Sequence, residues 1–566
     1  MSTEKFWTKS YDKHVKKTLD YPTEGLGTLL LNSISKFPEK AGGYFMNYTM
    51  SFKEMSELAE RFATFLQKNG VEKGDVVAIS LPNSPQFNIA HIGAQLIGAA
   101  TSGVSPLLSD EEIAYQLNDS NTKVIITLDA VYAKVLNKVL DEIPNLKIIV
   151  TTSIAEYMGF SAIKVFLGKL LKKIPSGKVK PWPGKLVAKF KEIMAEENPI
   201  DYKTASIDVA KDLCVLQYTG GTTGRPKGTQ LTHKNIISNM FQMNHWMNLE
   251  QGSGVTLSAF PYFHIAGMLV VNMSLYMGFS QILIANPRDT DHLIAEFIDK
   301  HPTIVANVPT LYNMIIANEK HKNIPKENLD AIIAYISGAA PFPVESIKEF
   351  EESMSAENKV LEVYGMTETS PLLTANPILG TKKIGTVGLP FPDTDIQLLD
   401  LDSGKPVGIG ERGEIVCKGP QVTKGYHNKP EATKNTIIDG WLHTGDVGVF
   451  DEDGYLKIVD RVKDMIIVSG FKVYSVHVED VLTEHPDIEL CALIGLKDPN
   501  RPGSEIVKAF IQLKEGVEPT VKVTESIKAY AEDKLSKYEK PKQWEFKDEL
   551  PLTTVGKVLK RELREQ

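Results

Sequence analysis

The sequence predicts an α/β protein with more than one domain, and three observations lead to this fold class. The chain has 566 residues, which at ordinary domain sizes corresponds to about two to four domains. Its composition, 42% hydrophobic and 24% charged, supplies enough apolar side chains for extensive cores and excludes a largely disordered chain. Short apolar runs typical of strands alternate with longer helical patterns, which predicts parallel sheets covered by helices.

The expected elements follow one another along the chain. Buried strands are predicted where Val and Ile cluster, and helices where apolar residues recur every three or four positions. These elements are a strand at 76–81, a helix at 84–98, strands at 123–128, 213–217, 490–496 and 506–513, and a helix at 521–535. The last three predict a small α+β domain after Arg461.

Two long stretches, 76–109 and 251–287, contain no Asp, Glu, Lys or Arg. Each is longer than the roughly 20 residues that span a bilayer, so each is weighed as a membrane segment. Prolines and polar residues such as Asn83 and Asn272 interrupt both stretches, which favours buried strand-and-helix passages. The first residues show no signal-peptide pattern and the three cysteines lie far apart, so we expect a cytoplasmic protein without disulfides.

The net charge of -8 argues against a nucleic-acid partner, which ordinarily requires a basic surface. The segment from Lys164 to Lys191 is an exception, with nine lysines and no acidic residue. Apolar residues recur there at helical spacing, at Ile163, Phe166, Leu167, Leu170, Leu171 and Ile174. Two interpretations stay open: a surface helix packed on its own domain with solvated lysines, or a helix that binds an anionic membrane surface.

A loop rich in glycine and threonine, from Tyr218 to Gly228, follows the strand predicted at 213–217. Its free backbone NH groups, its hydroxyl groups and the cation of Lys227 suit a polyphosphate. The loop is not a Walker P-loop, because Lys227 precedes the last glycine instead of following it. A phosphate-binding loop is therefore predicted in preference to a flexible turn.

This loop resembles the phosphate-binding signature of the adenylate-forming superfamily, which comprises acyl-CoA synthetases, luciferases and the adenylation domains of peptide synthetases. Five further motifs of this superfamily occur in order and extend the resemblance over nearly the whole chain. They begin at Tyr364 (YGMTET), Gly410 (GERGE), Trp441 (WLHTGD), Asp460 (DRVKD) and Pro551 (PLTTVGK). The segment 439–463 is most similar to the signature of bacterial long-chain fatty-acid–CoA ligases, from which it departs at Asp439, Phe450, Glu452 and Val462.

The resemblance implies a fold and a reaction. The fold is a large N-terminal domain, residues 1–462, of two α/β subdomains plus a distorted β-barrel, and a small mobile α+β C-terminal domain, residues 463–566. The reaction joins a fatty acid to CoA with ATP and Mg²⁺ through an acyl adenylate, and releases AMP and pyrophosphate. The alternatives are a medium-chain or aryl-CoA ligase, a luciferase-like oxidase, a fatty-acyl-AMP ligase, and a non-catalytic nucleotide- or lipid-binding homologue.

The resemblance also implies roles for the residues that match the family motifs. Those expected around the ATP phosphates are Thr219, Gly220, Gly221, Thr222, Thr223, Gly224 and Lys227. Thr367 would contact the α-phosphate, and Glu368, with Thr219, would hold Mg²⁺. Those expected around adenine and ribose are Gly338, Ala339, Ala340, Tyr364, Gly365, Asp446 and Arg461.

The remaining assignments concern domain movement and the acyl path. By resemblance, Lys557 is the catalytic lysine carried by the small domain, Lys463 is the hinge, and Gly470 admits the pantetheine arm of CoA. His264 aligns with an aromatic motif beside the acyl path, although it is equally well interpreted as a core histidine and receives no proton-transfer role. Met268 stands where some long-chain members carry a gating Trp.

The uncharged stretch 251–287 gains a second interpretation, as the wall of an apolar tunnel for an acyl chain. The expected partners are therefore a fatty acid, ATP and CoA. The enzyme is expected in the cytoplasm, and on the inner face of the membrane if the Lys164 to Lys191 segment binds lipid. Whether it forms a homodimer stays open.

Overall fold

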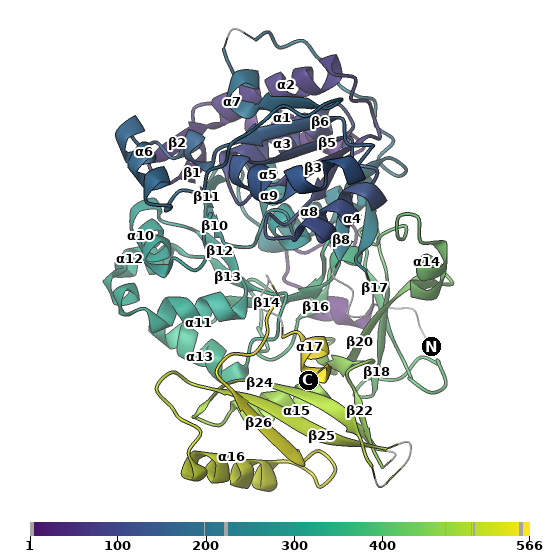
Figure 1. The fold of residues 1–566 in the computed structure, drawn as a ribbon. Coiled ribbons are helices and arrows are strands. Elements are labelled where there is room, and N and C mark those ends of the chain that lie inside the picture. The colour runs from purple at the N-terminus through teal and green to yellow at the C-terminus, as the bar shows by residue number, and fades with distance from the viewer. Residues whose placement is uncertain are drawn as a thin grey trace.

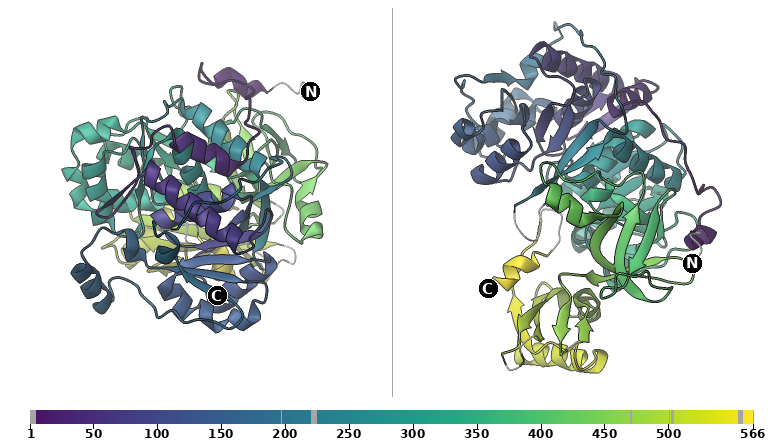
Figure 2. Two further views of the ribbon diagram at one scale, coloured as in Figure 1. Left: turned by 90° about the horizontal axis from the view of Figure 1, so that it is seen from above. Right: turned by 90° about the vertical axis from the view of Figure 1, so that its right-hand side faces the viewer.

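A computed structural model describes residues 5–196, 198–219, 225–469, 471–499, 501, 504–553 and 558–565. A large N-terminal domain occupies the upper and middle parts of Figure 1, and a smaller C-terminal domain lies at the bottom. Figure 2 shows the small domain as a compact unit at one end of the molecule. This α/β architecture agrees with the predicted fold class.

The first sheet of the N-terminal domain has seven strands in the order β7-β6-β5-β3-β4-β8-β9. All neighbours are parallel except β8 and β9, which form an antiparallel pair at one edge. The strands are β3 (Val76–Ser80), β4 (Ala100–Gly103), β5 (Val124–Leu128), β6 (Ile148–Thr152), β7 (Leu186–Lys189), β8 (Leu213–Thr219) and β9 (Lys227–Thr232). The β8–β9 pair frames the glycine- and threonine-rich loop.

The second sheet has nine strands in the order β16-β15-β14-β13-β12-β10-β11-β1-β2. Its centre is parallel and both edges are antiparallel. The strands are β1 (Ala41–Phe45), β2 (Tyr48–Ser51), β10 (Val255–Ser258), β11 (Ser280–Leu283), β12 (Ile304–Asn307), β13 (Ala334–Ser337), β14 (Val360–Gly365), β15 (Leu372–Ala375) and β16 (Leu389–Pro390). The loop after β13 carries residues 338–340, and the end of β14 with the turn after it carries the motif that begins at Tyr364.

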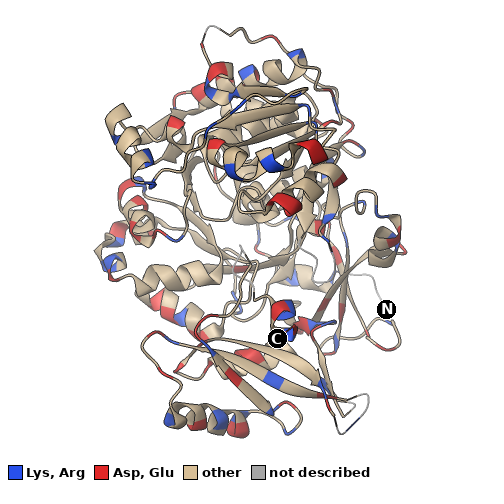
Figure 3. Cartoon of the chain, in the orientation of Figure 1, with Lys and Arg blue, Asp and Glu red and all other residues tan. Residues whose placement is uncertain are grey.

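Buried helices connect the two sheets. α1 (Leu26–Ile34) packs against α3 (Pro85–Leu96) and α9 (Ile265–Met277), and α9 also packs against α8 (His233–Met247). Every residue of α3 is buried, and so are nearly all residues of α9, which explains why both charge-free stretches lack ionic side chains. In Figure 3 the strands in the middle of the upper half are mostly tan, whereas the helices in front of them carry charged residues.

The outer helices of the N-terminal domain are shorter or more polar. They are α2 (Phe52–Lys68), α4 (Asp110–Asp119), α5 (Asp129–Lys134), α6 (Ala162–Leu170), α7 (Phe190–Ile193), α10 (Thr290–Lys300), α11 (Pro309–Ala317), α12 (Lys326–Ala331), α13 (Val344–Ser353) and α14 (Pro430–Thr436). In the described part of the chain, no helix combines the length and the apolar character needed to cross a membrane.

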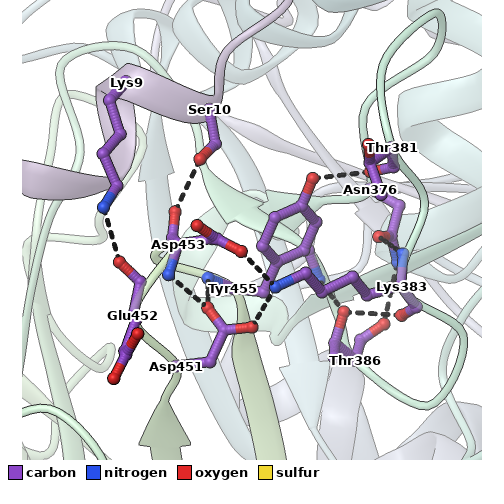
Figure 4. A network of polar contacts seen from close by, with 11 residues as sticks. Lys9, Ser10, Asn376, Thr381, Lys383, Thr386, Asp451, Glu452, Asp453 and Tyr455 are labelled. Carbon is purple, nitrogen blue, oxygen red and sulfur yellow. Dashed lines mark hydrogen bonds and ion pairs between the residues drawn. The ribbon is translucent and has the colours of Figure 1, made fainter.

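A third, antiparallel sheet completes the N-terminal domain. It contains β17 (Asp395–Leu399), β18 (Arg412–Lys418), β19 (Ile437–Ile438), β20 (Trp441–Phe450) and β21 (Leu456–Arg461). A polar network ties the β20–β21 turn to the rest of the domain (Figure 4): Lys383 Nζ lies 2.5 Å from Asp451 Oδ2 and 2.7 Å from Asp453 Oδ2. Near the N-terminus, Lys9 donates to the Glu452 carbonyl at 2.7 Å.

The C-terminal domain has its own core. Its three-stranded sheet has the order β24 (Ile488–Lys497), β25 (Glu505–Leu513), β26 (Gln543–Lys547), beside the hairpin β22 (Ile466–Val468) and β23 (Phe471–Val473). The helices α15 (Ser475–Thr483), α16 (Val521–Lys534) and α17 (Lys560–Arg564) surround the sheet. A separate cluster of buried residues, from Ile466 to Leu535, holds these elements together.

The strands and helices predicted from the sequence are confirmed within a few residues, with one correction. The apolar stripe from Ile163 to Ile174 is not one continuous helix, because α6 ends at Leu170. Lys172 adopts the left-handed region at φ 57°, and the Ile174 NH then returns to the Gly168 carbonyl at 3.0 Å. Ile174 is therefore buried against Gly168, while the helix itself contributes no buried residue.

Candidate active site

One large cavity, of about 1650 Å³, lies where the N-terminal domain meets the C-terminal domain. The motifs predicted to bind nucleotide converge on it from the ends of β8, β13, β14 and β21. The site residues predicted from the sequence that line it are Thr219, Lys227, His264, Gly338, Ala339, Ala340, Gly365, Thr367, Glu368, Arg461 and Lys463. Segments far apart in the chain thus form one site.

The β8–β9 pair positions the ends of the loop rich in glycine and threonine. Thr219, the last residue of β8, pairs with Lys227, the first residue of β9. The Lys227 ammonium lies 4.3 Å from the centre of the Tyr426 ring, so a cation–π contact places the charge at the cavity. Gly220, Gly221, Thr222, Thr223 and Gly224 lie outside the described residues.

The turn after β14 carries Thr367 and Glu368. Both side chains are buried, at 8% exposure each, and both line the cavity. Tyr426 donates a hydrogen bond from Oη to Glu368 Oε1 at 2.6 Å, which fixes the direction of the carboxylate. Burial, together with the charge of Glu368, raises the pKa of Tyr426, so its phenol stays a donor.

Gly365 precedes this turn and touches the backbone of β15. A Cβ atom at this position would lie 1.9 Å from the Pro371 carbonyl oxygen, which no side chain tolerates. The glycine therefore lets β14 and the following turn approach closely enough to place Thr367 and Glu368 in the cavity.

Tyr364, Asp446 and Arg461 form a linked group beside the cavity. Asp446 on β20 stands opposite Arg461 on β21, and Arg461 Nε donates to Asp446 Oδ1 at 2.8 Å. Tyr364 Oη donates to Asp446 Oδ2 at 2.7 Å. Burial and the Asp446 charge raise the pKa of Tyr364, so its proton is held toward the carboxylate. Arg461 is among the residues that line the cavity, whereas Tyr364 and Asp446 are next to it in the linked group and are not among them.

The loop after β13 contributes the small residues Gly338, Ala339 and Ala340 to the wall. Ala339 adopts a left-handed backbone conformation at φ 69°. A Cβ atom on Gly338 would lie 2.8 Å from Val363 Cγ2, so the loop sits directly on β14. Residues 338–340 therefore border the cavity with small side chains only.

An apolar wall continues the cavity away from these polar groups. The residues that form it include Phe260, Phe263, Ile265, Leu269, Val270, Met273 and Ile336. Met268, the second acyl-path candidate, is not among the lining residues but packs in the core at 1% exposure.

His264 caps the start of α9 at the edge of this wall and accepts a hydrogen bond from the Ala266 NH at 3.3 Å. Burial lowers the pKa of His264 to about 4, so its imidazole is neutral at physiological pH. Its described hydrogen bond is this helix cap, and we assign it no proton-transfer role.

The C-terminal domain closes the other side of the cavity. Thr553 and Val558, on either side of 554–557, both line it. Lys557 and Gly470 lie outside the described residues. Lys463 lines the cavity at the junction of the two domains, directly after β21.

A buried ionic network joins the two domains at this junction. Ser475 Oγ donates to Asp460 Oδ1 at 2.9 Å, and Lys560 Nζ donates to Ser475 Oγ at 2.7 Å. Lys560 also lies 2.7 Å from Glu479 Oε1, and Arg564 lies 2.8 Å from Asp464 Oδ1. The last helix, α17, is thereby fixed against the end of β21 and the residues that follow it.

Sequence reasoning missed Tyr426, Ser475 and Lys560. No motif marks them, because each acts through a partner that is remote in the chain, such as Glu368, 58 residues from Tyr426. Tyr426 and Lys560 stand in segments whose composition is typical of an ordinary protein surface. Only the folded contacts distinguish them.

The chain belongs to the family of AMP-binding enzymes. The model of that family matches residues 31–427, and the model of the C-terminal domain of AMP-binding enzymes matches residues 477–557. The protein is therefore a ligase of the adenylate-forming class, as its fold and the converging motifs predict.

Its curated relatives align over the full length. The long-chain-fatty-acid–CoA ligase of Bacillus subtilis is 38% identical, with 100% of this chain and 99% of the relative covered. A long-chain-fatty-acid–CoA ligase of Escherichia coli is 34% identical, with 100% and 98% covered. A feruloyl-CoA synthase of Amycolatopsis is 31% identical, with 96% and 99% covered.

Solved structures share the fold. The anthranilate CoA ligase AuaEII, in complex with anthranoyl-AMP, superposes with a TM-score of 0.83 at 24% identity, with 96% of this chain and 97% of that chain covered. ATP-bound MatB from Rhodopseudomonas palustris superposes with a TM-score of 0.78 at 27% identity, with 95% and 98% covered.

Proposed function

We propose that this enzyme is a long-chain fatty-acid–CoA ligase that converts a fatty acid, ATP and CoA to acyl-CoA, AMP and pyrophosphate. The observation that carries the proposal is one cavity whose polar end holds Thr219, Lys227 and Glu368 and whose other wall is apolar. The full-length relatives with 34–38% identity carry this activity in their names.

The first half-reaction is an attack by a carboxylate oxygen of the fatty acid on the α-phosphorus of ATP. The bond from that phosphorus to the bridging oxygen breaks, pyrophosphate leaves, and an acyl adenylate forms. Negative charge accumulates around the phosphorus, so groups that are fixed in advance stabilise the transition state most. We assign this role to Lys227 and Thr367, with the loop from Thr219 to Gly224 around the β- and γ-phosphates.

The nucleoside would lie against the loop after β13 and the end of β14. We assign adenine to the Gly338–Ala340 backbone and the Tyr364 ring, and the ribose hydroxyls to Asp446 and Arg461. Asp446 keeps a second lone pair on each oxygen after its bonds to Tyr364 and Arg461, so it can still accept from the ribose.

The residues present fit a Mg²⁺ ion that arrives with ATP. Among the described residues, no group of three or more His, Cys, Asp or Glu side chains could hold a metal ion by itself. Mg²⁺ on nucleotide enzymes usually takes one or two carboxylates plus substrate phosphates, and the fixed Glu368 carboxylate and the Thr219 hydroxyl supply such oxygen ligands. The ion would neutralise phosphate charge there.

The second half-reaction transfers the acyl group to CoA. The CoA thiol releases its proton to water and its sulfur attacks the acyl carbon; the bond from that carbon to the phosphate oxygen breaks, and AMP leaves. We propose that residues 1–462 and 463–566 move as two units about Lys463, which brings Lys557 to the first half-reaction and Gly470 to the second. Thr553 and Val558 at the cavity support the first arrangement.

We also propose that the ligase works in the cytoplasm, at the inner face of the membrane. The exposed lysine-rich segment around α6 supports this location, as developed in the next subsection. A homodimer stays a prediction, to be measured by light scattering of the purified protein.

Pyrophosphate exchange and CoA-thioester formation across a panel of long-chain, medium-chain, short-chain and aryl acids test the activity. We expect both activities, with the highest kcat/KM for long-chain acids. Exchange without thioester would indicate an acyl-AMP ligase, and a preference for feruloyl-type acids would indicate an aryl-CoA ligase. If no acid supports pyrophosphate exchange, the proposed ligase activity is wrong.

A further inference from the structure

The helix α6 exposes the apolar face that an ordinary surface helix buries. None of its nine residues is buried. Five large apolar side chains in this helix and at its end are 47–74% exposed, namely Ile163, Phe166, Leu167, Leu170 and Leu171. They follow the spacing i, i+3, i+4, i+7 and i+8, so they share one face.

The segment that carries α6 is nevertheless held in place. Ile174 folds back on Gly168 at 7% exposure, and Tyr132 Oη on α5 donates to the Lys180 carbonyl at 2.6 Å. Gly177 packs against Asp129, where a Cβ atom would lie 2.3 Å from the carbonyl oxygen. The anchors therefore fix the segment from its C-terminal side and leave the apolar face of α6 outward.

Basic side chains surround this face. Lys164, Lys169, Lys172 and Lys173 lie within the helix or directly after it, and residues 164–191 contain no acidic residue. Within that segment, the described ion pairs involve Lys189 alone, which meets Glu192. The charge around α6 is thus available to an anionic surface.

The position of α6 leaves room for a large flat partner. Figures 1 and 2 show the helix on the outer edge of the N-terminal domain, away from the C-terminal domain. Contiguous exposed apolar residues ringed by positive charge match a bilayer that contains anionic phospholipid, because its acyl region takes the apolar side chains and its headgroups pair with lysines.

We propose that α6 docks the enzyme on an anionic bilayer, with Ile163, Phe166, Leu167, Leu170 and Leu171 inserted below the headgroups. The inference deepens the proposed function, because a ligase on this surface would meet fatty acids where they partition. Vesicle binding needs no ATP, CoA or turnover, so the inference and the ligase activity can fail independently.

Flotation of the full-length protein with vesicles tests the docking. We expect binding to vesicles of equimolar phosphatidylcholine and phosphatidylglycerol, weak binding to phosphatidylcholine alone, and release by added salt. The double variant Phe166→Ser, Leu170→Ser is expected to bind at least about tenfold more weakly, because two apolar anchors are lost. The quadruple variant with Lys164, Lys169, Lys172 and Lys173 changed to Gln is expected to weaken binding to a similar extent.

Matched changes on α16 serve as controls. Lys522 and Lys528 are exposed lysines on a helix that also carries acidic residues, and Lys522→Gln, Lys528→Gln should bind vesicles like the unmodified protein. Equal binding of the α6 variants and the unmodified protein would overturn the proposal, as would no binding to anionic vesicles.

A fluorescent label distinguishes insertion from surface attraction. All three native cysteines are buried, so Leu167→Cys introduces the single exposed thiol for an environment-sensitive fluorophore. We expect a blue shift and protection from iodide on anionic vesicles, whereas a label at Val521→Cys on α16 should not respond. If the fluorescence of the label at position 167 does not change on anionic vesicles, the bilayer does not cover the apolar face of α6. A dimer that the α6 variants abolish would likewise refute the bilayer as the partner of this face.

Discussion

The hydroxyl of Tyr364 lies 2.7 Å from Asp446 Oδ2, while the other oxygen of this carboxylate accepts from Arg461 Nε at 2.8 Å. The carboxylate proposed to bind the ribose is therefore held from both sides by residues of β14 and β21. Such a carboxylate loses little freedom when a ligand arrives, which favours binding.

Tyr364→Phe should weaken ATP binding more than it slows chemistry. The ring that we assign to adenine is kept, but Asp446 loses one orienting donor, so the KM for ATP should rise about threefold to tenfold with a smaller change in kcat. Steady-state pyrophosphate exchange measures both constants. Tyr335→Phe is the control, since the Tyr335 hydroxyl is buried without a partner in the described structure, and an equal effect there would contradict the prediction.

Glu368→Gln should depress adenylation at all but high Mg²⁺ concentrations. An amide keeps the shape but removes the negative charge, and we expect kcat/KM for ATP to fall about 100-fold. Pyrophosphate exchange measured across a Mg²⁺ titration should need a higher Mg²⁺ concentration in the variant than in the unmodified protein. A variant with the ordinary Mg²⁺ dependence would remove Glu368 from the metal site.

Glu362 on β14 should make stability depend on pH. Burial, with the Asp480 carboxylate nearby, raises the pKa of Glu362 from 4.5 to about 8. The folded state therefore holds this proton more tightly than the unfolded chain, and the stabilisation is complete below about pH 4.5 and lost as pH rises through about 8. Glu362→Gln should reduce the fall in Tm over that range by several degrees. Parallel Tm curves for the two proteins would show that another group is responsible.

Lys557 and Lys560 should behave differently although they are three residues apart. Lys557→Ala should slow adenylation at least about 100-fold yet leave thioester formation from supplied acyl-AMP nearly unchanged. Lys560→Met leaves Glu479 and Asp460 without their buried partner, so it should lower the free energy of unfolding by about 3 kcal/mol. Denaturant titration and separate half-reaction assays measure these effects. Equal loss of both half-reactions in Lys557→Ala would contradict the domain movement.

Val270 on α9 should influence the length of the accepted acyl chain. Val270→Phe fills part of the apolar wall and should lower kcat/KM for palmitate at least about tenfold more than for octanoate. Val270→Ala enlarges the same place and should not disfavour palmitate. A uniform loss for both acids in Val270→Phe would indicate general damage instead of a shortened path.

Much of the fold could be predicted from local sequence patterns. The strand Val76–Ser80 and the helix Pro85–Leu96 are buried on all sides. Such burial requires a stretch without charged residues, and this pattern can be recognised in the sequence. The motifs that we assign to nucleotide binding could be recognised because each is a short contiguous segment. Their glycines and hydroxyl residues are not explained by packing in a core. The cavity then brings them together from the ends of strands in three different sheets, and this convergence is a property of the tertiary fold.

Other features lack a local signal. α9 is apolar on every side, so its periodicity does not reveal that Leu269 and Val270 face the cavity while Met268 packs in the core. The end of α6 was misjudged because the spacing of Ile174 continues the stripe, whereas the left-handed Lys172 turns the chain back. Contacts between remote segments, such as Tyr426 with Glu368, follow from the tertiary fold alone.

The burial of the three cysteines has a chemical consequence for an enzyme that makes an acylating agent. Burial raises the pKa of Cys214, Cys417 and Cys491, although Cys491 borders the cavity itself. A thiol that stays protonated is a poor nucleophile. We therefore expect these three thiols to compete poorly with the thiol of CoA for an acyl adenylate.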